Sequence, residues 1–491
     1  MYLVSSIEYP ATQYEPALPE VNGVYHEDRE VNLTGAAGAS QMYRTYNAKF
    51  LPASSEWQLD NSSLPAYATV QNYDGSIHYY TMPALSGNWS TWEGSDNNAV
   101  YNGVDFGMDP SGIADSTDAL RAAVTAALDG GGGVIFIPAG TYQLSDVTDL
   151  AFTGVPGEDP GFVIAGAGAS TQLTQTDVTK DVFSISGVTS GKGVRFKDLR
   201  ISYTTTETTP ETLSAAIRVA SGCQNVTCER VYFKDCPQAF DTQGLQCGLF
   251  NCTIAYNNFA ASESVIPTMV NLNGTENFID SCVISQQPQG NEIDPGPAGC
   301  VGVLIVPGGG AYYVTNSHIS DFTQGIVVND GPNLTRVFCS NVICESWTNS
   351  LVIQRTGSQN ISQVYCDDCL FARTNDSTDD TSIGVLIDTG GGDNSTVGDI
   401  FLNNCMCFQW NVAGVQINRG SKIVITGGRY GSNGLGEGST GGGIAIIGTA
   451  GDVTINGADL TPKVVGPDFP NQAYALSITA AVNGLAWRQL S

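Results

Sequence analysis

A four-residue motif recurs along most of the chain after about residue 190. Most copies begin with Asn, Asp, Ser or Gly and carry apolar residues at the second and fourth positions. The ten copies begin at Asp198, Arg230, Asn251, Ser281, Asn316, Asn341, Asp368, Asn404, Gly427 and Gly457. Their spacings run from 21 to 36 residues, which is the range of repeat proteins. A short strand cannot bury its apolar face alone, so the repeat favours a stack of similar units.

A second series of short apolar segments is interleaved with the first. These segments begin at Ala216, Gly302, Gly325, Ser350, Gly384, Gly414 and Gly443. Two short strands per unit, each with alternating apolar residues and bounded by Gly or Asn, are typical of a coil in a solenoid. The sequence therefore predicts an all-β fold, a right-handed parallel β-helix of about ten rungs. Equivalent side chains of successive rungs should form ladders about 4.8 Å apart.

The repeat also assigns side chains to the interior of this helix. One predicted interior column contains Leu199, Val231, Cys252, Cys282, Val342, Cys369 and Cys405. A second contains Ile201, Phe233, Ile254, Ile284, Ile319, Cys344, Phe371 and Cys407. The thirteen cysteines are odd in number and closely spaced, which makes a poor disulfide framework. Metal binding by Cys366, Cys369, Cys405 and Cys407 is the alternative, but the columns favour cysteine as a small buried apolar residue.

A single helix is expected just before the first coil. Ser116 and its acidic neighbours are suited to cap a helix start, and four glycines at 130–133 end it. Apolar residues recur on one face, at Leu120, Val124 and Leu128. Because a solenoid exposes its terminal rung, we expect this helix to cap the open end.

The chain is therefore divided into four regions. Residues 1–100 form a small β-rich N-terminal region, and 101–145 contain the capping helix and the first coil. The parallel β-helix occupies 146–465, and 466–491 form a C-terminal cap segment.

The formal net charge of −28 argues against nucleic acid, whose phosphates such a chain repels. No stretch reaches the ~20 apolar residues of a membrane span, so membrane insertion is not expected. The start of the chain lacks the basic and apolar regions of a signal peptide. No cofactor is expected, and no motif indicates Ca²⁺.

Candidate catalytic residues lie on two outward ladders. The first holds His318 and Asp321 on one rung, Glu345 on the next and Arg373 on the one after. The second holds Asp330, Arg355, Asp388 and Arg419 on successive rungs. Carboxylates on adjacent rungs would stand about 5 Å apart, near the separation in retaining glycosidases.

The predicted catalytic residues are thus Asp330, Asp388, Asp321 and Glu345, and the predicted substrate-binding residues are Arg355, Arg373, Arg419 and His318. In the alternative interpretation these polar residues only satisfy backbone groups at the turns of a solenoid.

The segment D-F-G-x-D-x-S-G-x-x-D-S-T-x-A-L, from Asp105 to Leu120, is followed by GGGGVIFIPAGTY. This pairing resembles the opening of the pectate-lyase-like β-helix superfamily, which includes bacteriophage tailspikes and many polysaccharide lyases, hydrolases and epimerases. Residues 46–92 resemble a module of phage tail fibres and minor tail proteins. The superfamily's catalytic motifs are missing, so the resemblance assigns no catalytic residue.

The resemblance implies a bacteriophage tail protein, either a tailspike or a minor tail protein. Such a protein would be a homotrimer in the virion, joined to other tail or baseplate proteins through its N-terminal region. It would act outside the cell on host surface polysaccharide, and the sequence leaves open whether it cleaves the glycan or only binds it. The alternative is a secreted polysaccharide lyase or glycoside hydrolase.

Overall fold

The chain divides into two units, Met1–Trp92 and Glu93–Ser491. The computed structural model describes, in the second unit, residues 100–151, 161–189, 193–204, 214–256, 268–286, 300–306, 308–329, 335–354, 363–374, 381–388, 399–420, 422–431, 433, 442–448, 450–460, 474–478 and 485–488. In the first unit it describes six strands. They are β1 (Glu20–Val21), β2 (Val24–Glu27), β3 (Ala48–Leu51), β4 (Glu56–Leu59), β5 (Ala66–Gln71) and β6 (Ile77–Met82). Four of these form a sheet in the order β1-β2-β6-β5, and β3 pairs with β4.

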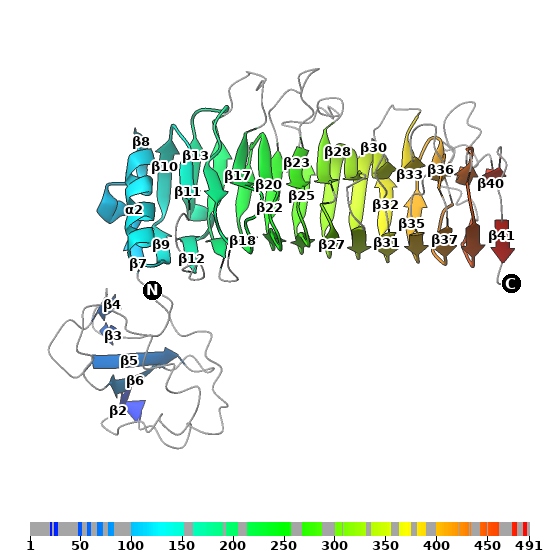
Figure 1. Ribbon diagram of the computed structural model, residues 1–491. Helices are drawn as coiled ribbons and strands as arrows, with labels where there is room; N and C mark the ends of the chain where they lie inside the picture. Colours follow the sequence, from blue (N-terminus) through cyan, green and yellow to red (C-terminus); the bar gives the residue numbers. More distant parts are fainter. Residues whose placement is uncertain are drawn as a thin grey trace. The chain divides into compact units, whose positions relative to one another are not determined.

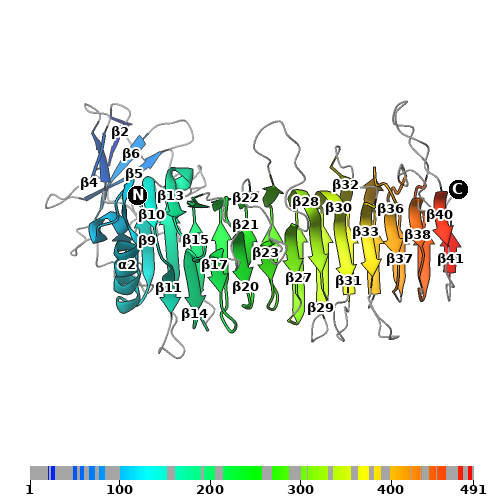
Figure 2. The same ribbon diagram turned by 90° about the horizontal axis from the view of Figure 1, so that it is seen from above.

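The second unit is a stack of coils along one axis (Figures 1 and 2). One face is a 14-stranded sheet, here called the first sheet. Its strands are β7 (Val100–Asn102), β9 (Gly133–Ile137), β12 (Phe162–Gly166), β15 (Val194–Lys197), β18 (Val226–Glu229), β21 (Gly248–Phe250), β24 (Phe278–Asp280), β27 (Gly310–Thr315), β29 (Thr335–Ser340), β31 (Gln363–Asp367), β34 (Asp399–Asn403), β37 (Ile423–Thr426), β39 (Val453–Asn456) and β41 (Leu485–Arg488).

The remaining strands of this unit form the second sheet. They are β8 (Ser111–Asp115), β10 (Gly140–Leu144), β11 (Thr148–Ala151), β13 (Thr171–Gln175), β14 (Phe183–Ser186), β16 (Arg200–Tyr203), β17 (Ala215–Val219), β19 (Tyr232–Lys234), β20 (Gln238–Thr242), β22 (Thr253–Tyr256), β23 (Thr268–Leu272), β25 (Val283–Gln286), β26 (Val301–Ile305), β28 (His318–Val328), β30 (Ile343–Gln354), β32 (Leu370–Arg373), β33 (Ile383–Asp388), β35 (Met406–Phe408), β36 (Ala413–Ile417), β38 (Gly442–Ile446) and β40 (Tyr474–Ile478). Short 3₁₀ turns lie at Gly103–Phe106 (η4) and Gly168–Ser170 (η5).

Strands in both sheets pair in parallel, in the register that the repeat predicts. Ile319, for example, is the partner of Ile284 on one side and of Cys344 on the other, and all three are buried. The members of both predicted interior columns are at most 2% exposed. All thirteen cysteines are buried and free, so the interpretation of cysteine as a small apolar residue is confirmed. The right-handed parallel β-helix is confirmed, whereas the number of rungs stays a prediction.

The first position of the recurring motif has a left-handed backbone in all ten copies, with φ between 50° and 66°. This conformation turns the chain from the first sheet into the second within one residue. Gly adopts it freely and Asn and Asp tolerate it, which explains the residue types found there. Arg230 is the exception, and its guanidinium offsets the strain by donating to both carboxylate oxygens of Asp198 one rung below, at 2.6 and 3.0 Å.

Replacing Asn341 tests this turn, because its φ is 53° and its side chain donates to Asn316 Oδ1 at 3.0 Å. We expect Asn341→Ala to lower the free energy of unfolding by about 1–2 kcal/mol relative to Asn341→Gly. Both variants lose the side-chain bond, so the difference isolates the backbone conformation. Urea denaturation measures it, and equal stabilities would contradict the account.

The glycines of the second series lie where strands of neighbouring rungs approach closely. A Cβ on Gly384 would stand 2.6 Å from the indole nitrogen of Trp410. That nitrogen donates to the carbonyl of Phe371 at 3.1 Å in the core. The recurring Gly therefore marks the inner corner of each coil.

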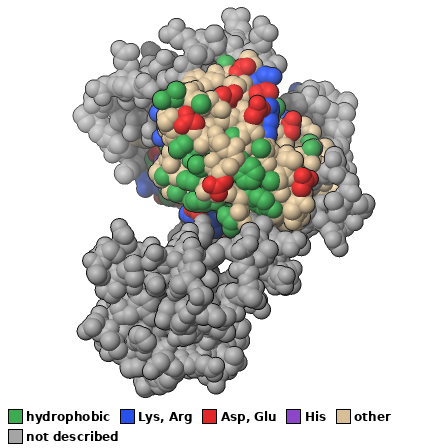
Figure 3. All heavy atoms as spheres, turned by 90° about the vertical axis from the view of Figure 1, so that its left-hand side faces the viewer, with side chains coloured by type: hydrophobic (Ala, Val, Ile, Leu, Met, Phe, Trp, Pro, Cys, Tyr) green, Lys and Arg blue, Asp and Glu red, His purple; other side chains and the backbone are tan. Residues whose placement is uncertain are grey.

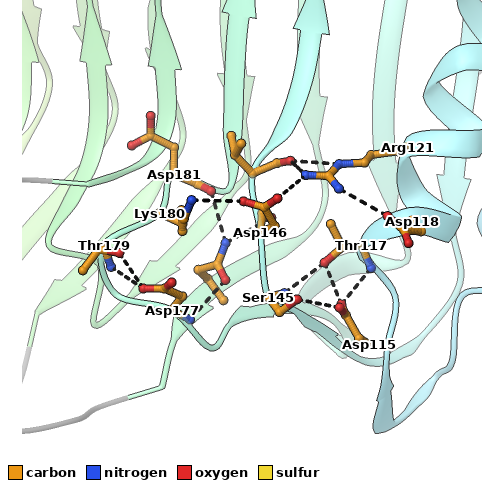
Figure 4. A network of polar contacts seen from close by, with 12 residues as sticks. Asp115, Thr117, Asp118, Arg121, Ser145, Asp146, Asp177, Thr179, Lys180 and Asp181 are labelled. Carbon is orange, nitrogen blue, oxygen red and sulfur yellow. Dashed lines mark hydrogen bonds and ion pairs between the residues drawn. The ribbon is translucent and has the colours of Figure 1, made fainter.

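The helix α2 (Thr117–Asp129) covers the end of the β-helix at β7 and β9 (Figure 1). Its buried residues include Leu120 and Val124 of the predicted apolar face. Arg121 fastens it to the first coil by donating to Asp146 at 2.8 Å and to the carbonyl of Val147 at 3.1 Å (Figure 4). The capping helix is therefore confirmed.

Of the residues predicted to cap the start of this helix, Asp115 supplies the side-chain hydrogen bond. Asp115 accepts from the backbone N–H of Thr117 at 3.0 Å, whereas the hydroxyl of Ser116 accepts from the N–H of Asp109.

Hydrophobic side chains gather on the surface of this end (Figure 3), and Ile113 there is 84% exposed. In the part of the chain that the structure describes, no helix is long and apolar enough to cross a membrane.

Candidate functional site

Three residues of the first predicted ladder come together at the junction of β28 and β30. Ser320 and Glu345 are registered partners, so Asp321 and Glu345 come from adjacent rungs, about 4.8 Å apart along the axis. His318 lies on the same rung as Asp321, and its Nε2 is 3.1 Å from Glu345 Oε2. The side chains of His318 and Glu345 are 41% and 43% exposed, so a ligand in solvent can reach them.

Asp321 lies at the corner where its coil bends within the second sheet. The pairing of β28 with β30 is irregular on both sides of Phe322, and the φ of Asp321 is 68°. Asp235 and Gln409 have φ values of 53° and 69° between the two second-sheet strands of their own coils, so this is a recurring corner conformation. The indole of Trp347 donates to the carbonyl of Asp321 at 3.1 Å and holds the corner in place.

The surroundings of the Asp321 carboxyl favour its protonated form. Burial raises its pKa above the ordinary 3.8, and the negative charge of Glu345 adds to the rise. Hydrogen bonds from the hydroxyls of Ser320 and Ser285 oppose this rise in pKa. Ser320 donates to Ser285 at 3.0 Å, and Ser285 donates to Asp321 Oδ2 at 3.4 Å. The positive charge of His318 also opposes the rise. The site therefore combines a carboxyl whose pKa is raised by burial with a second carboxylate hydrogen-bonded to an imidazole, which is a basis for acid–base chemistry.

Asp321→Asn tests the cost of this carboxylate to the fold. A carboxyl with a raised folded pKa binds its proton more tightly when folded, so its contribution to stability is complete below pH 3.8 and is lost as the pH rises through the raised value. We expect the variant to be more stable than the parent chain at pH 7 and to lose that advantage at about pH 3. Urea denaturation at the two pH values measures this. Asp149→Asn, at an exposed carboxylate, should show no such dependence.

The fourth member of the first ladder, Arg373, is directed elsewhere. Its backbone is registered with Ser346, next to Glu345, but its guanidinium donates to Asn411 Oδ1 at 2.6 Å. Asn411 is 6% exposed, so the guanidinium of the half-exposed Arg373 is held by a buried partner. Substrate binding by Arg373 stays a prediction.

The second ladder is only partly described. Asp330 and Arg355 lie outside the described residues. Asp388 accepts from the amide of Asn418 on the next rung at 2.9 Å, and Arg419 is exposed. Gln354 likewise donates to Asn329 at 3.0 Å. This pairing of side chains between rungs matches the alternative interpretation of turn residues that satisfy one another, and catalytic roles for Asp388 and Asp330 stay predictions.

A further charged cluster was missed at the sequence level. Arg218 donates to both oxygens of Asp181, at 2.7 and 3.1 Å, and also to Asp241. Asn271 on the next rung donates to Asp241 at 2.9 Å. Burial raises the pKa of Asp241 despite the opposing charge of Arg218. The variable third position of the second series, which Arg218 occupies, was the available signal.

Among the described residues, no group of three or more His, Cys, Asp or Glu side chains is arranged to hold a metal ion.

No protein-family model matches the chain. Mannuronan C5-epimerase AlgE1 of Azotobacter vinelandii is 37% identical over 94 residues, which are 17% of this chain and 6% of the epimerase. Among solved structures, the A-module of mannuronan C-5 epimerase AlgE4 of the same organism has a TM-score of 0.43 and 16% identity, and covers 80% of this chain and 97% of the module. A tailspike protein of E. coli bacteriophage HK620 has a TM-score of 0.48 and 16% identity, and covers 79% of this chain and 65% of the tailspike.

The chain thus spans only a small part of the curated relative that it matches. The parallel coils of the chain place it in the class of right-handed parallel β-helix proteins. This is the fold that the resemblance of the segment from Asp105 to Leu120 implies.

Proposed function

We propose that this chain binds a polysaccharide and hydrolyses it at His318, Asp321 and Glu345. The observation that carries the proposal is the pair of carboxyl groups on adjacent rungs, one of them with a raised pKa. A spacing of about 4.8 Å along the axis is close to the ~5–5.5 Å of retaining glycosidases.

In the proposed reaction Asp321 donates its proton to the glycosidic oxygen as the bond to the anomeric carbon breaks. The carboxylate of Glu345 forms a bond to that carbon, and His318 orients this carboxylate through its ring nitrogen. Water then attacks the anomeric carbon, Asp321 takes up the proton of this water, and Glu345 is released.

The charges of the site favour a neutral glycan. A uronate polymer such as mannuronan carries one carboxylate per sugar and would be repelled both by Asp321 and Glu345 and by the net charge of −28. The second candidate function, elimination or epimerisation of a uronate, is favoured by the local sequence identity with mannuronan C5-epimerase AlgE1. It would require a cationic group to neutralise the carboxylate of the substrate.

Substitution of the two carboxyl groups tests hydrolysis. We expect Asp321→Asn and Glu345→Gln each to lower kcat by about 10²–10⁴-fold, because each removes a group that transfers a proton or attacks carbon. Release of reducing ends from a panel of neutral bacterial surface polysaccharides measures the activity. The exposed Asp149→Asn variant is the matched control and should retain full activity.

Two results would contradict hydrolysis at this site. Reducing ends released equally well by both variants would place the activity elsewhere. Ultraviolet absorbance of unsaturated products from a uronate polymer would instead support the second candidate.

We propose further that the chain is a bacteriophage tail protein that acts on host surface polysaccharide outside the cell. The resemblance of residues 46–92 to tail-fibre modules supports this proposal. In this proposal the predicted N-terminal region, residues 1–100, joins three copies of the chain into a homotrimer and attaches them to other tail or baseplate proteins of the virion.

The assembly role predicts that removing the first unit changes the mass of the particle in solution. We expect the full chain to be a trimer and a fragment starting at Glu93 to be a monomer, as measured by size-exclusion chromatography with light scattering. Starting at Glu93 keeps β7, which pairs with β9 at the capped end. A monomeric full chain would contradict the assembly role and favour a secreted enzyme.

A further inference from the structure

An exposed apolar column runs through the candidate site on the outer face of the second sheet. His318 is the registered partner of Val283 on one side and of Ile343 on the other. The column continues through Leu370 to Met406. We call Val283, Ile343, Leu370 and Met406 the apolar strip. Val283, Ile343 and Met406 are 44%, 41% and 42% exposed, and the strip spans four rung spacings, about 19 Å.

The neighbouring column of the second sheet is built mainly of small, buried residues. Ser285, Ser320, Glu345 and Ala372 are successive registered partners. Glu345, which bonds His318, is therefore the large side chain of that column and stands beside the apolar strip. A linear polymer that lies along the helix axis over Glu345 contacts the strip over several rungs.

The strip selects for particular groups on that polymer. Its side chains are aliphatic and present neither a hydrogen-bond donor nor a charge. A sugar hydroxyl pressed against them loses hydrogen bonds to water without replacement, whereas a methyl group there is removed from water favourably. Single exposed apolar residues are ordinary, but here three exposed residues and the half-buried Leu370 share one column of five rungs, with His318 as its one polar member.

We infer that the substrate is an uncharged glycan that carries methyl groups, and that these groups contact the apolar strip. The methyl groups belong either to 6-deoxy sugars or to acetyl substituents, which present the same chemistry to the strip. This inference rests on the proposed function, because it places the glycan at Glu345.

Binding to the full chain with Glu345→Gln, which removes the proposed nucleophile, tests the inference. The probes are two matched pairs, oligosaccharides of L-fucose against L-galactose and of N-acetylglucosamine against glucose. The members of each pair differ in the methyl-bearing group. We expect at least one methyl-bearing probe to bind about four-fold more tightly per contacting methyl group than its partner, by isothermal titration calorimetry. The pair that shows the difference identifies the source of the methyl group.

Second-site variants then locate the contact. Ile343→Ser and Met406→Ser, added to Glu345→Gln, should abolish the preference for the methyl-bearing probe over its partner. Phe250→Ser is the matched control, because Phe250 is 40% exposed but lies in the first sheet, outside the strip. It should keep the preference.

Three results would overturn the inference. These are equal affinities within both pairs, a preference that survives Ile343→Ser and Met406→Ser, and a change of particle mass in those variants by light scattering. The last result would show that the strip is a contact between copies of the chain. Reducing-end release by the unsubstituted chain is measured in parallel. Equal cleavage of the matched probes would contradict this inference alone. No cleavage of any glycan would contradict the proposed function.

Discussion

The left-handed residue that closes each coil is the constraint on which the remaining structure depends. Because φ lies between 50° and 66° at all ten copies of the motif, each of these ten coils turns from the first sheet into the second at the same point. Each side chain then stacks on its counterpart one rung away. Interior columns fill the core, and outward columns bring residues about 30 positions apart in sequence to about 4.8 Å along the axis. Asp321 and Glu345 become neighbours in this way.

The same geometry gives the site its electrostatic character. Asp321 lies at a corner held by the indole of Trp347, and this placement buries a carboxyl that a simple turn would leave in water. A solenoid tolerates the unfavourable burial of one carboxyl, because each rung contacts mainly its two neighbours and the long apolar core stabilises the stack. A residue that weakens the fold at neutral pH and yet faces a partner carboxylate is the pattern expected of an acid–base site.

The sequence predicts what depends on backbone periodicity and predicts poorly what depends on side-chain direction. The interior columns and the proximity of His318, Asp321 and Glu345 follow from the spacing of the repeat, because register alone determines them. The capping helix follows from its cap residues and its apolar periodicity. The position of the Arg373 guanidinium does not follow from spacing. A long side chain at a corner can reach a different rung, and here it reaches Asn411. The cluster around Arg218 was missed because its partners Asp181 and Asp241 both lie outside the two series of recurring segments.

Apolar side chains form two outward columns, one on each side of the left-handed turn. The two columns differ in how much of their apolar surface a ligand can contact. On the first sheet, Tyr313, Phe338, Tyr365 and Phe401 stack with ring centroids 5.3, 5.1 and 4.8 Å apart and interplanar angles of 11°, 9° and 2°. Each ring covers the face of the next, so only ring edges meet solvent, and a sugar cannot stack on them along most of the column. The apolar strip leaves its aliphatic groups open beside Glu345. The same stacking of rungs thus buries the aromatic faces of the first-sheet column against one another, whereas it leaves the aliphatic side chains of the apolar strip available to a ligand.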